Sequence, residues 1–134
     1  MKLASMIGSV CIASLALLGC ASQVTQPDEY SGFLGDYSRL KQNKSPSGAE
    51  VMRWIDPTID PSKYTSIYIE PTQLYPKPQP TVRIPQATLS GITAYYDQAL
   101  MREAGRSLPL AKSPGPGVLV MRAAITAVGS KTQG

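Results

Sequence analysis

The chain has 134 residues, 43% of them hydrophobic, and its 13 Lys and Arg against 9 Asp and Glu give a formal net charge of +4. This length suits one small domain, and the basic residues do not form the clusters typical of nucleic-acid-binding surfaces. The chain has no histidine and only two cysteines, Cys11 and Cys20. The commonest general base and metal ligand are therefore missing, and we predict neither a metal site nor a cofactor.

The N-terminus predicts secretion followed by lipid attachment. Met1-Lys2 precedes the apolar run "MIGSVCIASLALL" of residues 6–18, and small Gly19 precedes Cys20, as in a secretory signal peptide. The run is shorter than the ~20 residues of a membrane-spanning helix. "LLGC" resembles the bacterial lipobox, which implies diacylglyceryl transfer to the Cys20 thiol and cleavage between Gly19 and Cys20. An ordinary secretory signal cut elsewhere is the alternative.

We therefore assign residues 1–19 to a lipoprotein signal peptide and residues 20–31 to a lipidated, solvated tether. Ala21 and Ser22 follow the cysteine, and the lack of an aspartate there resembles outer-membrane sorting signals. This predicts an outer-membrane lipoprotein whose domain faces the periplasm. Cys11 would leave with the signal peptide, so the mature domain would contain no disulfide and no free thiol.

The first half of the domain predicts irregular chain followed by two strands. Residues 32–50 contain Gly, Pro and isolated apolar residues, with a turn at "SPSG". Residues 51–55 and 64–70 show the alternation of strands. The linking loop carries Asp56-Pro57 and Asp60-Pro61, in which aspartates close turns. We expect the two strands to form an antiparallel pair.

A proline-rich connector over residues 71–82 precedes the clearest helix, Gln86 to Ala104. Pro85 suits its first turn, and Gly105 is placed to cap its end. Apolar residues recur at helical spacing and predict one buried stripe. This stripe consists of Leu89, Ile92, Tyr96, Ala99 and Leu100.

Residues 118–128, "VLVMRAAITAV", predict a long strand whose continuous apolar character favours a central position covered on both faces. A strand of this kind needs neighbours, which indicates either self-association through the C-terminal strand or a shortened family member. The predicted fold class is α/β (α+β): a small sheet of about three strands with one packed amphipathic helix, over residues 32–134. Trp54 and Ile67 are expected to cover the helix stripe.

Several blocks in order resemble a known family. "YSGFLGDYSRLK", "MRWIDP", "YTSIYIEP" and "IPQATL…YYDQAL" are similar to an uncharacterised family of Gram-negative lipoproteins, known as domain of unknown function number three-three-one-three. The resemblance covers most of residues 30–128 and implies no activity. Members of the family usually continue well beyond a strand equivalent to 118–128.

Two classes of function are compatible with the residues. The favoured one is a non-catalytic interaction or accessory module of the envelope, with an envelope protein or glycan as partner. Trp54 and Tyr68 are its candidate interaction surface, since aromatic residues with polar tips are enriched at interfaces; half-buried packing is the alternative role. The other class is a glycan-acting or hydrolytic enzyme that uses a carboxylate pair drawn from Asp56, Asp60 and Glu70.

Overall fold

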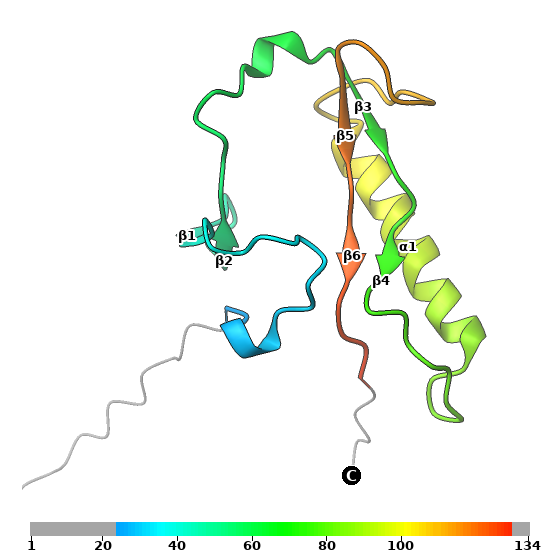
Figure 1. Cartoon of the computed structure of the whole chain (residues 1–134). Coiled ribbons are helices and arrows are strands. Elements are labelled where there is room, and N and C mark those ends of the chain that lie inside the picture. The colour runs from blue at the N-terminus through cyan, green and yellow to red at the C-terminus, as the bar shows by residue number, and fades with distance from the viewer. Residues whose placement is uncertain (1–23, 130–134) are drawn as a thin grey trace, which may run out of the picture.

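The computed structural model describes residues 24–129 as an α+β fold with one long helix and three two-stranded sheets (Figure 1). This confirms the predicted class of a few strands and one packed helix. The elements, in chain order, are η1 (Pro27–Glu29), β1 (Lys41–Lys44), β2 (Glu50–Arg53), η2 (Pro61–Lys63), β3 (Ser66–Ile69), β4 (Gln73–Leu74), α1 (Gln86–Ala104), β5 (Val118–Met121) and β6 (Ala124–Ile125).

Helix α1 has the predicted limits and packs against β3. Its Leu89 side chain is the most deeply buried of the described residues, with 2% of its surface exposed, and it meets the buried Ile67 and Ile69 of β3 in the core. The predicted stripe is wrong at Tyr96, which is 42% exposed. The half-buried neighbour Asp97 replaces it, because its carboxylate accepts the main-chain N–H of Thr72 at 2.8 Å.

Strand β3 is the central strand of the core. It pairs in parallel with β5, with Ile67 opposite Leu119, and its other edge forms a bridge to Leu110. The predicted antiparallel pairing of residues 51–55 with 64–70 is therefore wrong. The partner of β2 is β1, across a turn in which Gly48 has a φ of +85°. The polar sequence "KQNK" of β1 is exposed throughout, so it carries no apolar alternation that would reveal a strand.

The predicted strand 118–128 is divided into β5 and β6 by Arg122 and Ala123. Strand β6 pairs in parallel with β4, a short strand inside the proline-rich connector. The predicted central position is wrong, because β5 pairs with β3 alone among the described residues, and Val120 is 39% exposed. Continuous hydrophobicity does not distinguish a central strand from an edge strand that packs on one face.

The hairpin of β1 and β2 stands apart from α1 (Figure 1). Ile67 lies in the core as expected, but Trp54 is 41% exposed and does not cover the helix, because β2 is not part of the sheet on which α1 packs. The guanidinium of Arg39 lies over the Trp54 ring, 4.0 Å from its centroid. Within residues 24–129, no helix combines the length and apolarity needed to cross a membrane.

Candidate binding pocket

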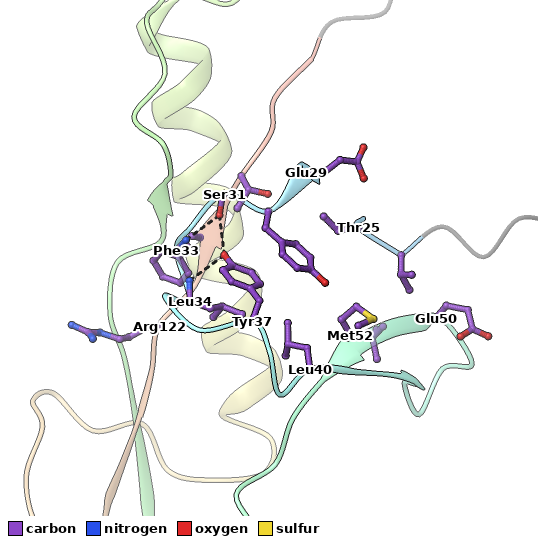
Figure 2. Close-up of a pocket in the computed structure, with 15 residues that line it drawn as sticks. Thr25, Glu29, Ser31, Phe33, Leu34, Tyr37, Leu40, Glu50, Met52 and Arg122 are labelled. Carbon is purple, nitrogen blue, oxygen red and sulfur yellow. Dashed lines mark hydrogen bonds between the residues drawn. The ribbon is translucent and has the colours of Figure 1, made fainter. Parts of the chain in front are cut away.

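A pocket of about 480 Å³ lies between the N-terminal segment, the β1–β2 hairpin and the chain around β6 (Figure 2). The chain around β6 is distant in sequence from the other two parts, so the pocket exists only in the folded chain. Most of its lining is apolar or aromatic, with a few polar and charged side chains. The principal lining residues are Val24, Thr25, Glu29, Tyr30, Ser31, Phe33, Leu34, Tyr37, Leu40, Glu50, Val51, Met52, Arg122, Ala124 and Thr126.

Aromatic stacking and a small hydrogen-bond network shape the N-terminal wall. The rings of Tyr30 and Tyr37 stack with centroids 4.3 Å apart. The Tyr37 hydroxyl accepts the main-chain N–H of Leu34 at 3.2 Å and lies 3.4 Å from the Ser31 hydroxyl (Figure 2). Ser31 also accepts the N–H of Phe33. The hydrogen bond with Ser31, then that from Leu34, lowers the pKa of Tyr37.

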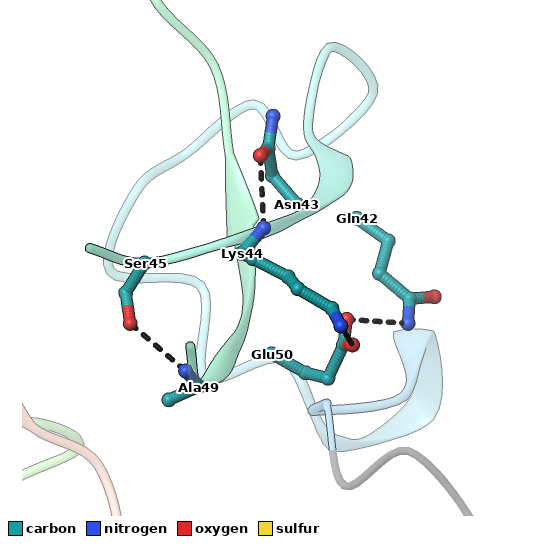
Figure 3. A network of polar contacts seen from close by, with 6 residues as sticks. All are labelled: Gln42, Asn43, Lys44, Ser45, Ala49 and Glu50. Carbon is teal, nitrogen blue, oxygen red and sulfur yellow. Dashed lines mark hydrogen bonds and ion pairs between the residues drawn. The ribbon is translucent and has the colours of Figure 1, made fainter. Parts of the chain in front are cut away.

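The three charged lining residues are engaged by protein partners. Glu29 accepts the N–H of Gln26 at 2.9 Å and so closes the short η1 turn. Glu50 accepts the side-chain amide of Gln42 at 3.0 Å and pairs with Lys44 at 3.9 Å (Figure 3).

Arg122, the cationic lining residue, forms an ion pair with Glu70, with Nε and Oε2 2.8 Å apart. The hydrogen bond to Glu70 raises the pKa of Arg122 above its ordinary value. Each charged lining residue thus has a protein partner, and most of the remaining lining is apolar or aromatic.

The three carboxylates considered for catalysis also have protein partners, and that of Glu70 is Arg122. Asp56 accepts the main-chain N–H of Thr58 at 2.8 Å together with its hydroxyl, and these hydrogen bonds lower the pKa of Asp56. Asp60 accepts the main-chain N–H and the hydroxyl of Ser62 and caps η2. These are the turn-closing aspartates that the Asp-Pro pairs predict. Across residues 24–129, no three His, Cys, Asp or Glu side chains gather as metal ligands would.

The structure places the two aromatic candidates apart in the topology. Trp54 directly follows β2, whereas Tyr68 lies half-buried in β3, and these strands belong to different sheets. A single surface was expected because the two strands were predicted to pair, and they do not. An interaction role for either residue stays a prediction. Gly19 and Cys20, the cleavage and lipidation residues, lie outside the described residues.

Sequence reasoning missed the pocket because it interpreted residues 32–50 as irregular chain pinned by scattered apolar residues. The available signal was the aromatic pair Tyr30 and Tyr37 with Phe33 between them. Spacing alone does not show that the two tyrosines stack or that the chain around β6 faces them, since both contacts depend on the tertiary fold.

Comparison with known proteins identifies the family to which the chain belongs. The chain matches the family described as "Protein of unknown function (DUF3313)" over residues 29–134, so it belongs to this family. This confirms the resemblance found in the sequence blocks. No solved structure matches the chain significantly.

Two curated relatives are both called "Uncharacterized lipoprotein YdcL", one from Escherichia coli strain K12 and one from Escherichia coli O157:H7. Each is 44% identical to this chain over 120 residues, which cover 90% of the chain and 54% of the relative. The chain thus spans about half the length of the curated relatives that it matches. It is a member of a lipoprotein family of unknown function.

Proposed function

We propose that this protein is a lipid-anchored envelope module that binds a partner without catalysing a reaction. In this proposal Cys20 carries the lipid, the anchor lies in the outer membrane, and the domain faces the periplasm. The observation that carries the binding role is the pocket lined by Tyr30, Phe33, Leu34, Tyr37 and Met52. Mostly apolar concave surfaces with a few polar groups are typical of binding sites.

The position of the pocket in the chain supports a site close to the membrane. Val24 lines the pocket and follows Cys20 closely in sequence. Because an extended chain spans at most ~3.6 Å per residue, Val24 stays within about 15 Å of the lipidated residue. Two or more acyl chains give stable anchoring, at ~0.8 kcal/mol per buried methylene. The partner would therefore be an envelope protein or glycan within reach of that surface.

The enzyme alternative has weaker support. Asp56 and Asp60 are held by Thr58 and Ser62, and Glu70 is paired with Arg122. A catalytic pair has two carboxylates that face one substrate. Replacing each acid in turn by its amide tests this alternative, since a shared loss of turnover on an envelope glycan with the fold intact would favour the enzyme.

The anchor is tested by Cys20→Ser, with Cys11→Ser as the matched control. Serine does not form the thioether, so we expect Cys20→Ser to leave the membrane fraction and to lose incorporation of labelled fatty acid. Cys11→Ser alters the signal peptide alone and should keep both properties. Equal labelling of the wild type and Cys20→Ser would contradict lipidation at this residue.

The pocket is tested by a photo-crosslinking amino acid placed at Leu34, a lining residue that is 56% exposed. Val82, fully exposed and outside the pocket lining, is the control position. In intact cells, we expect one defined product at Leu34 that is absent at Val82 and lost in a Tyr37→Ala background. Identical products at both positions, or none at Leu34, would contradict a binding role for this pocket.

A further inference from the structure

The outer edge of β5 and β6 has the chemistry of a strand acceptor. On the inner side, the carbonyls of Gly117, Met121, Ala123 and Ile125 accept N–H groups from residues of the β3–β4 segment. Main-chain groups of successive residues in a strand point to opposite sides. The N–H and C=O groups of the alternate residues, Val120 foremost, are therefore directed away from β3 and β4.

This outer edge has no partner in the described part of the chain. Strand β5 has β3 on one side and no strand on the other (Figure 1), and outside the paired strands no main-chain hydrogen bond among residues 24–129 involves Arg122. Neither proline nor lysine protects β5, which reads "VLVM". Unprotected apolar edges of this kind are templates for pairing with another strand.

The edge also continues into the candidate pocket. Arg122, Ala124 and Thr126, alternate residues along this segment, line the pocket. A strand added beside β5 and extended toward β6 would therefore border this pocket, and its side chains on the same face of the sheet would be close to it. Strand addition characteristically combines main-chain hydrogen bonding with side-chain pockets in this way.

The length of the relatives indicates where the added strand comes from. The described residues bury only three apolar side chains, those of Ile67, Ile69 and Leu89, and each sheet is two-stranded. Isolated two-stranded sheets are marginally stable. The E. coli relatives share 54% of their length with this chain, so nearly half of each lies outside the match and offers ample polypeptide for more strands.

We propose that the open edge of β5 and β6 is the docking edge for a further β-strand, supplied by the part of the longer relatives that lies outside the matched region. Val120 stands at the centre of this edge, because its N–H and C=O are the pair that the new strand would engage. The inference does not depend on the lipid anchor, and it shares with the proposed function only the pocket that the added strand would border.

Hydrogen exchange at single amides tests the edge directly, in this chain and in the full-length E. coli K12 relative. In this chain we expect the amide of Val120 to exchange at least ~100-fold faster than that of Leu119, which faces β3. In the relative, the amide aligned with Val120 should be as protected as its neighbour. Fast exchange at that position in both proteins would overturn the proposal.

Proline substitution gives a second, independent readout. Val120→Pro removes an outward N–H, and proline is tolerated on open edges, so this chain should unfold at nearly the same denaturant concentration as the wild type. The equivalent proline should sharply destabilise the relative. Leu119→Pro is the matched control and should destabilise both proteins, because it removes an N–H directed at β3.

A second copy of this chain is the competing occupant. It would make protection of Val120 increase with protein concentration, and Val120→Pro would convert a dimer into a monomer during sedimentation. Either result would overturn the proposal in favour of self-association through the C-terminal strand. A monomer at all concentrations, with an unprotected Val120, agrees with a strand from the unmatched part of the longer relatives.

Discussion

The unit formed by β3, α1 and β5 differs from the segment of residues 24–60 in how it is held together. All three buried apolar side chains of the described residues belong to the first unit, on β3 and α1. The second has a hairpin with an exposed first strand, several turns closed by side chains, and the stacked pair Tyr30 and Tyr37. Apolar burial stabilises one region, and local polar contacts shape the other.

The difference separates stability from recognition. Burial of apolar surface is the dominant favourable contribution to folding, so the β3–α1–β5 unit carries most of the stability. Segments with few buried contacts open more readily and are often those that bind ligands. The pocket takes most of its wall from residues 24–52, which agrees with this division.

The largest expected effect is that of Leu89→Ala. The side chain is almost fully buried, and its truncation should lower the free energy of unfolding by ~2–5 kcal/mol. Leu34→Ala is the matched control in the other region, with an expected change within ~0.5 kcal/mol because Leu34 is exposed. Urea unfolding measures both. Equal losses for the two variants would refute the proposed division.

The next largest effect should come from Asp97, which connects α1 to the chain after β3. Asp97→Ala removes the acceptor of the part-buried Thr72 N–H, and an unsatisfied buried donor costs ~1–3 kcal/mol. Asp97→Asn keeps an acceptor oxygen and should lose less. Thermal unfolding of the two variants distinguishes these outcomes, and identical melting of Asp97→Ala and wild type would show that the hydrogen bond is dispensable.

A smaller effect is expected for Trp54, in the region held by local contacts. Its ring is exposed and lies under the Arg39 guanidinium, an interaction that contributes about 0.5–1 kcal/mol at such sites. Trp54→Ala should therefore cost no more than this amount, and Trp54→Phe less. A loss comparable to that of Leu89→Ala, measured in the same urea series, would place Trp54 in a core after all.

The smallest effect concerns pH. The hydrogen bonds from Thr58 hold the pKa of Asp56 below its ordinary value in the folded chain. The resulting stabilisation is therefore present above the unfolded pKa and is lost as pH falls through the folded pKa. We expect the difference in stability between wild type and Asp56→Asn to shrink over this acidic range. Carboxyl NMR titration checks the pKa, and a value at or above that of the unfolded chain would contradict the contact.

Features that depend on neighbouring residues could be predicted from the order of residues along the chain. The limits of α1 follow from Pro85 and the helical spacing of apolar residues, and the alternation around Ile67 identifies β3. The turn-closing roles of Asp56 and Asp60 follow from side chains that reach the main chain two residues ahead. These interactions are local, so the order of residue types is enough to predict them.

The pairing of the strands and the position of the pocket depend on the tertiary fold. β1 is invisible to hydrophobic patterning because none of its side chains is buried, and β5 is as apolar as a central strand although its outer edge is open. Asp97 faces the packed side of the helix in place of Tyr96 because its carboxylate accepts the main-chain N–H of Thr72. Each of these features depends on which distant segment packs against a given surface. Residue types determine which kinds of side chain a surface can bury, but they do not specify which segment packs there.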